Sequence, residues 1–255
     1  MAIRSYFDGS RAEAVSMTLA AILADEEVWG RFEDDWRAVL WDRGQAPYMH
    51  MKEAMSLKGA FEGWSKAQRD HLFHGLQTLL MMYADERRFS VFTCTIDLQA
   101  HTRHRSMNPV RPEHICADQV FRCVLRWYRD LPEPILAPME LFFDRNEKFK
   151  GRLYREWNNQ RNRKREPFWG MIRSIAESDM RMTPALQGAD MVAWARNRLE
   201  STPADSELTL KPDNRVHDLH GAFARLILSG VDRDYSHVNV TEMDLATKRL
   251  LSSME

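Results

Sequence analysis

The sequence predicts an α/β fold, because short apolar segments typical of strands alternate along the chain with longer segments that carry a helical apolar stripe. At 255 residues, with 44% hydrophobic and 29% charged side chains, the chain is long enough to bury a substantial core. It contains no internal repeat, no low-complexity tract and no linker that would force two domains. We therefore expect one domain over residues 1–213 and a C-terminal helical extension, residues 214–255, packed on it.

The N-terminal segment predicts two paired strands. The stretch SYFDGS at residues 5–10 places two aromatic side chains before Asp8. The apolar run VSMTLAAILAD at 15–25 is typical of a buried strand that pairs back onto the first. Because Asp-Gly-Ser is also common in turns, Asp8 is either a turn residue or a carboxylate that ends an apolar strand for a functional reason.

Two helices are predicted next. Residues 26–43 carry apolar side chains at spacings of three and four, and Gly44 stands where a C-terminal cap is expected; the apolar positions are Trp29, Phe32, Trp36 and Val39. In the segment 65–84, Ser65 and Gln68 form a capping box. The apolar stripe of this second helix consists of Leu72, Phe73, Leu76, Leu80 and Tyr83.

The second half of the chain continues the alternation. Strands are predicted at 88–98, 139–144 and 169–179, and in the first of these Phe92, Cys94, Ile96 and Leu98 share one face. Helices are predicted at 113–129 and from Thr183-Pro184 to about 200. The other segments are a basic loop at 101–112, a polar and basic helix or loop at 147–166, a surface loop at 201–213, and then a helix, a short strand at 235–240 and a final helix.

Composition limits the classes of partner and compartment. The net charge of −1 gives no overall attraction to nucleic acid or membrane, so any such attraction must come from local patches. Three cysteines without a C-x-x-C pair are typical of reduced thiols. The N-terminus lacks the apolar core of a signal peptide and no stretch is long enough to span a bilayer, so we expect a cytoplasmic protein.

Three carboxylates stand in positions that invite a common explanation. FFDRNE at 142–147 repeats the pattern of SYFDGS, so Asp144 and Asp8 will project from one edge if their strands are neighbours in a sheet. Asp190 lies among apolar residues of a predicted helix, where an unpaired carboxylate is costly. Convergent carboxylates repel one another without a cation, and Mg²⁺ prefers oxygen ligands. Two such ions can stabilise both the attacking and the leaving oxygen in phosphodiester cleavage.

Each carboxylate also has a structural interpretation. Asp8 could belong to a turn, Asp144 could cap a helix with Glu147 completing an Asp-x-x-Glu box, and Asp190 could pair with a buried arginine. Taken one at a time, these structural interpretations are favoured over a metal site. All three become weaker when the carboxylates are considered as one pattern.

The order of motifs resembles a known family. YFDGS, a tryptophan-rich helix, YMHMKE, FFDRNE and LQGADMVA follow one another over roughly residues 5–198. In this order they resemble the bacterial proteins grouped as the domain of unknown function 3800 family. The resemblance implies a ribonuclease H-like mixed sheet flanked by helices, similar to Holliday-junction-resolving nucleases. It also implies metal ligands, Mg²⁺ or Mn²⁺ being the ion, at Asp8, Asp144 (with Glu147) and Asp190. One departure is that the family's Asp-Glu-Ser-Gly motif has Gly9 here at its second position.

Further residues are candidates for accessory roles. In YMHMKE, His50 and Glu53 are interpreted either as groups that support the site, with His50 as a proton shuttle, or as the start of a surface helix. Gln187 shares a helix face with Asp190. Two basic stretches, 152–165 and 101–114, could bind phosphates or lie on solvated surfaces. Within the first we expect nucleic-acid contacts from Arg155, Arg161, Arg163, Lys164 and Arg165.

These observations predict a divalent-metal-dependent nuclease in which Asp8, Asp144 and Asp190 are catalytic. A non-catalytic nucleic-acid-binding or assembly protein on the same scaffold is the alternative, and a metal-dependent phosphatase or nucleotide hydrolase is a third candidate. The chain has no G-x-S-x-G, no phosphate loop with its Lys-Ser/Thr and no H-E-x-x-H. Monomers and homo-oligomers are both compatible with the sequence, as are DNA and RNA as substrates.

Overall fold

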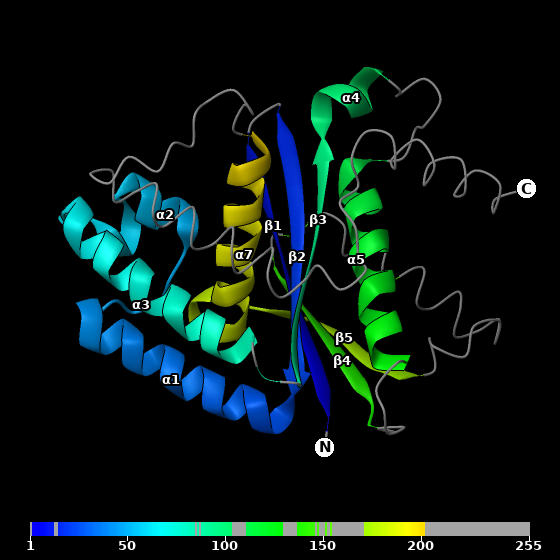
Figure 1. Ribbon diagram of the computed structural model, residues 1–255, viewed down its shortest axis with the longest axis horizontal. Helices are drawn as coiled ribbons and strands as arrows, with labels where there is room; N and C mark the ends of the chain where they lie inside the picture. The colour runs from blue at the N-terminus through cyan, green and yellow to red at the C-terminus, as the bar shows by residue number, and fades with distance from the viewer. Residues whose placement is uncertain are drawn as a thin grey trace, which may run out of the picture.

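The computed structural model describes residues 2–12, 15–84, 86, 88–103, 111–129, 137–145, 147, 151, 154 and 171–201. Over these residues the chain forms a mixed five-stranded sheet with helices on both faces, which confirms the predicted α/β class (Figure 1). The strands are β1 (Ile3–Ala12), β2 (Ser16–Asp25), β3 (Phe89–Asp97), β4 (Met139–Asp144) and β5 (Ile172–Ser178).

The strand order places β1 at the centre of the sheet. The order is β3-β2-β1-β4-β5, with β1–β2 and β2–β3 antiparallel and β1–β4 and β4–β5 parallel. A parallel pair needs a long crossover, and the chain between β1 and β4 provides it. The antiparallel pairing of β2 with β1 was predicted from the sequence and is confirmed.

The helices divide between the two faces of the sheet (Figure 1). On one face lie α7 (Pro184–Ser201), α1 (Glu26–Gly44), α3 (Lys66–Ala84) and the short α2 (Met51–Ser56). The opposite face is covered by α5 (Pro112–Arg129), and α4 (Leu98–Arg103) follows β3 directly. We call the first of these faces the α7 face.

Alternation along the strands assigns each side chain to one of two cores. Phe7 of β1 packs with α5, whereas its neighbour Tyr6 packs on the α7 face, because successive strand side chains point to opposite faces. The predicted aromatic stripe of α1 is confirmed: Trp29, Phe32 and Trp36 are fully buried on the α7 face. The predicted capping box of α3 is also present, with the Gln68 amide donating to Ser65 Oγ at 3.2 Å.

Two local predictions are wrong. Helix α1 includes Gly44, and Gln45 is the cap residue with a left-handed φ of 52°. The glycine serves packing instead, since a Cβ at position 44 would lie 2.2 Å from the Trp64 ring. The predicted basic loop 101–112 is helical at both ends: residues 101–103 form the last turn of α4, and α5 begins at Pro112.

The remaining segment predictions lie outside the described residues. These are the middle of the 101–112 segment, most of 147–166, the loop 201–213 beyond its first residue, and the C-terminal extension 214–255. No helix in the described part of the chain combines the length and the hydropathy needed to cross a bilayer.

Candidate metal centre

The strand register brings Asp8 and Asp144 together. In the parallel pairing of β1 with β4, Tyr6 lies opposite Phe142 and Phe7 opposite Phe143, so the two aspartates come next in register. Tyr6 and Phe142 both pack on the α7 face, and side chains two positions further along a strand share that face. The two aspartate-bearing strands are thus neighbours, which is the condition under which the sequence placed Asp8 and Asp144 together.

Asp8 is not a turn residue, and it does not end its strand. It lies inside β1, paired with Ala20 of β2, and β1 continues to Ala12 whereas β4 ends at Asp144. The prediction of an aspartate at the tip of β1 is wrong for this reason. Its side chain is only 3% exposed, so the carboxylate is embedded between the sheet and α7.

Glu147 reaches back to the same point from beyond the end of β4. Its Oε1 accepts a hydrogen bond from the Gly9 amide at 2.8 Å. A Cβ at position 9 would lie 2.9 Å from that oxygen, so a glycine is what allows the carboxylate to approach the β1 backbone. Gly9, where the sequence departs from the Asp-Glu-Ser-Gly motif of the family that it resembles, is thus the position that accommodates Glu147.

The electrostatics of Asp8 and Glu147 are unfavourable for two anions. Burial, and then the negative charges of Asp190 and Glu147, raise the pKa of Asp8 well above its ordinary value. Burial likewise raises the pKa of Glu147, with Asp144 and Asp190 adding to the effect and the bonds from Asp8 and the Gly9 amide opposing it. Asp8 Oδ2 is buried and has no hydrogen-bond partner in the part of the chain that the structure describes.

Asp190 joins this group from α7. It lies in the second turn of the helix, it is 6% exposed, and its Oδ2 accepts a hydrogen bond from the Met51 amide at 2.7 Å. Burial raises its pKa to about 6, an effect that the Met51 amide and the interaction with His50 reduce. Its partner is a backbone amide, so the interpretation of Asp190 as the partner of a buried arginine is not supported.

These carboxylates fit a hard divalent cation. Ionised carboxylates only accept hydrogen bonds, Asp8 Oδ2 lacks a donor among the described residues, and the repulsion between the ionised groups is removed by protonation or by a bound cation. Among the residues that the structure describes, no three His, Cys, Asp or Glu side chains already form a metal-binding group. Mg²⁺ commonly uses one or two carboxylates and completes its shell with water and substrate phosphate, so a smaller protein donor set is sufficient.

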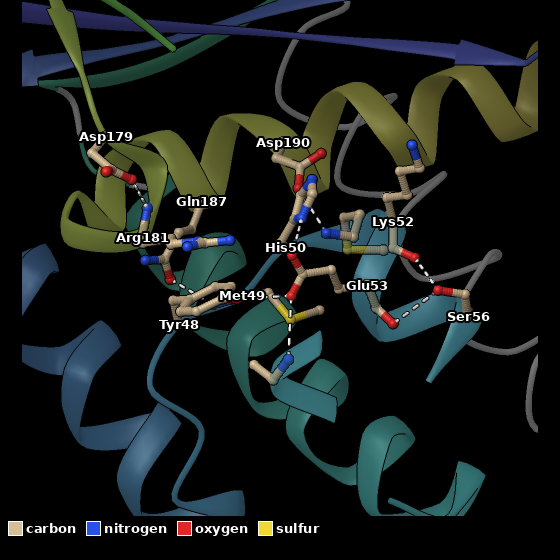
Figure 2. A network of polar contacts seen from close by, with 12 residues as sticks. Tyr48, Met49, His50, Lys52, Glu53, Ser56, Asp179, Arg181, Gln187 and Asp190 are labelled. Carbon is tan, nitrogen blue, oxygen red and sulfur yellow. Dashed lines mark hydrogen bonds and ion pairs between the residues drawn. The ribbon is translucent and has the colours of Figure 1, made fainter. Parts of the chain in front are cut away.

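Gln187 holds the segment before α2 against α7. Its Oε1 accepts hydrogen bonds from Trp36 Nε1 at 2.8 Å and from the Met49 amide at 2.9 Å, and its Nε2 donates to the Met180 carbonyl at 2.9 Å. The amide group is therefore engaged at both ends. Gln187 acts as an anchor for the segment 48–51 (Figure 2).

His50 and Glu53 belong to a polar network beside Asp190 (Figure 2). Nδ1 of His50 lies 3.2 Å from Glu53 Oε1, and the Tyr48 hydroxyl donates to Glu53 Oε2 at 2.8 Å. The Arg181 guanidinium lies over the Tyr48 ring at 5.4 Å. The sequence pattern did not indicate Tyr48, although it stands two residues before His50 in the YMHMKE motif, and no side-chain pattern could have indicated the Met51 amide.

The predicted nucleic-acid contacts are not among the described residues. Arg155, Arg161, Arg163, Lys164 and Arg165 all fall outside them, so this prediction stays a prediction. Arg145 lies within the described part, one residue beyond the end of β4. Its guanidinium is 3.7 Å from the Asp179 carboxylate.

Comparison with known proteins adds little. No family model matches the chain, so membership of the domain of unknown function 3800 family stays a prediction. No curated protein matches it either. A chain from the structure of the PCNA:RNase HII complex from Archaeoglobus fulgidus is 12% identical, with a TM-score of 0.39 over 98% of this chain and 89% of that chain. With a TM-score this low, the description of the fold rests on the sheet topology alone.

Proposed function

We propose that the protein is a divalent-metal-dependent nuclease that hydrolyses phosphodiester bonds in nucleic acid. One observation carries the proposal: the buried Asp8 and Asp190 interact with the partly buried Glu147 beside Asp144, and Asp8 Oδ2 has no hydrogen-bond partner among the described residues. Burying several ionised carboxylates is unfavourable unless protons or a cation neutralise them. The group therefore has the properties of a metal site more than those of a stabilising cluster.

Asp8, Asp144, Glu147 and Asp190 are the residues that would hold Mg²⁺ or Mn²⁺. When bound, the ion would supply stabilisation of the negative charge that develops on the phosphate. The protein would supply the rigid placement of its ligands. The sheet fixes Asp8 in β1, and the Met51 amide fixes the orientation of Asp190.

The test is cleavage of labelled single- and double-stranded DNA and RNA in Mn²⁺ by the wild type and by Asp8→Asn and Asp190→Asn. Both variants should lose at least about 10²-fold in rate, because the bound metal contributes several kcal/mol of transition-state stabilisation. Asp42→Asn is the matched control, since Asp42 is exposed on α1 and should leave the rate unchanged.

Circular dichroism should show that all three variants are folded. Cleavage that survives in both site variants would contradict the proposal. An inactive wild type that binds nucleic acid in EDTA and shows no Mn²⁺-dependent rise in melting temperature would favour the non-catalytic alternative.

A further inference from the structure

The backbone around His50 is fixed on α7 at two points. The Met49 amide donates to Gln187 and the Met51 amide donates to Asp190, and these two acceptors are one helical turn apart on α7. His50 is the residue between the two amides. Because both of its neighbours are tied to α7, the imidazole is carried on a rigid piece of chain beside the carboxylate group.

The imidazole is also oriented by its own hydrogen bond. Glu53 can only accept, so the 3.2 Å contact of its Oε1 requires the hydrogen to be on Nδ1 of His50. The other oxygen of Glu53 accepts from the Tyr48 hydroxyl at 2.8 Å and from the Ala60 amide at 3.3 Å. Burial tends to raise the pKa of Glu53, but the hydrogen bonds from Tyr48, His50 and Ala60 outweigh it and lower that pKa.

The backbone after α2 is shaped to receive the Glu53 carboxylate. Gly59 has a φ of +57°, and a Cβ there would lie 2.3 Å from Glu53 Oε2. Three donors and a glycine thus hold one carboxylate in place, and this carboxylate in turn holds His50. In a neutral imidazole, a carboxylate that accepts from Nδ1 fixes the tautomer of the ring and leaves Nε2 as the hydrogen-bond acceptor.

The position of His50 determines what its Nε2 could accept a proton from. Its side chain is 32% exposed, and Figure 2 shows the imidazole with Asp190 on one side and Glu53 on the other. The imidazole is therefore partly open to solvent and lies beside a carboxylate of the candidate metal site.

We propose that His50 is a catalytic residue that accepts the proton of the attacking water, and that Glu53 and Tyr48 are the residues that position it. This inference rests on the nuclease function proposed above. The water oxygen bonds to phosphorus while one of its protons passes to Nε2, the bond from phosphorus to the leaving oxygen breaks, and that oxygen takes a proton from solvent. Nδ1 keeps its hydrogen bond to Glu53 throughout.

The first test compares His50→Gln and His50→Ala with a control, His74→Ala, at an exposed position of α3. The two His50 variants should lose about 10²–10⁴-fold in cleavage rate with Mn²⁺ affinity retained, as is usual when a general base is removed. Added imidazole should restore part of the rate of His50→Ala and none of the rate of Asp8→Asn. Full activity in His50→Gln, or an absence of rescue, would overturn the proposal.

The second test needs neither metal nor activity. The ¹⁵N shifts of the imidazole, assigned by the signal lost in His50→Gln, should show the hydrogen on Nδ1 in the wild type. Glu53→Gln and Tyr48→Phe should reduce that tautomer while both variants stay folded. A hydrogen on Nε2 in the wild type would overturn the inference even if the protein cleaves nucleic acid. The expected tautomer in a protein that cleaves nothing would instead locate the failure in the proposed function.

Discussion

Gly9 shows how one residue can decide whether a carboxylate reaches the site. Its amide donates to Glu147 Oε1, and a methyl group at this position would lie 2.9 Å from the same oxygen. Contacts this short force either the carboxylate or the strand to move. The flexible end of Glu147 moves more easily than the central strand of a sheet.

We therefore expect Gly9→Ala to weaken Mn²⁺ binding about tenfold, a loss similar to that of a supporting residue at other metal sites. The free energy of unfolding without metal should change by less than about 1 kcal/mol. Titration of the melting temperature with Mn²⁺ measures both quantities. Gly30→Ala is the control, because nothing lies within 4 Å of a Cβ there, and it should stabilise α1 without altering the metal response. An unchanged Mn²⁺ affinity in Gly9→Ala would remove Glu147 from the proposed site.

At this scale the sequence predicts the acidic side chains but not their partners. Asp8 and Asp144 are found because each follows an apolar or aromatic pair in a strand pattern, and Asp190 because it interrupts an apolar helix. The role of the Met51 amide could not be predicted from the sequence, since every residue except proline has such a donor. The hydrogen bond from Gly9 to Glu147 depends on a register and a turn that spacing alone does not determine.

Among the elements, α7 carries more of the candidate site than its single aspartate suggests. Gln187 and Asp190 lie one turn apart on it, and between them they bind the Met49 and Met51 amides. Because α7 packs against β1 and β2, this arrangement ties α2 and His50 to the sheet.

Gln187→Leu should release that segment. Trp36 Nε1 and the Met49 amide would lose their acceptor in a buried environment, which costs about 1–3 kcal/mol for each unsatisfied donor. We expect the free energy of unfolding in urea to fall by about 2–4 kcal/mol and the amides of residues 49–51 to exchange faster with solvent. Gln68→Leu, which removes only the capping box of α3, should cost about 1 kcal/mol and leave those amides protected. Unchanged exchange in Gln187→Leu would show that other contacts hold the segment.

The elements themselves were predicted where a strong period exists. Helices α1, α3 and α5 have apolar side chains at helical spacing, and β3 alternates between faces, so each was found close to its observed bounds. The ends were harder to predict. Gly44 resembles a C-cap glycine, yet it is the next residue, Gln45, that adopts the left-handed conformation. The glycine at position 44 is explained by its close contact with Trp64 and not by backbone freedom.

For the molecule as a whole, the candidate site makes stability depend on pH. The folded-state pKa of Asp190 is raised to about 6, so between its ordinary value near 4 and this value the folded protein binds more protons than the unfolded one. The free energy of unfolding therefore falls as pH rises through this interval. Asp8 and Glu147, whose pKa values are also raised, act in the same direction.

The contribution of these three carboxyl groups should thus make the free energy of unfolding of the metal-free protein larger at pH 4.5 than at pH 7. Bound Mn²⁺ should reduce this difference. Asp190→Asn should flatten the dependence and stabilise the metal-free protein at pH 7 by up to about 3 kcal/mol. Urea unfolding at several pH values, with EDTA or with Mn²⁺, measures this effect. An Asp190→Asn variant with the wild-type pH profile would contradict the raised pKa.

At this scale the sequence predicts the class of fold well and the site only in part. Alternation of strands and helices is enough for the α/β class, but the repeated aspartate pattern does not by itself place β1 beside β4. The order of all five strands depends on long-range packing, which a single sequence does not encode in any local pattern.

The central place of β1 has a consequence for how the chain folds as it is synthesised. The hairpin and meander β1-β2-β3 can assemble once about the first hundred residues exist, but the second edge of β1 stays open until β4 emerges more than forty residues later. During that interval an aromatic strand with free amides and carbonyls is available for pairing with other chains. Asp8 lies in the middle of that open edge strand, where a solvated charge opposes aggregation. The carboxylate that is costly in the finished protein is protective in the unfinished one.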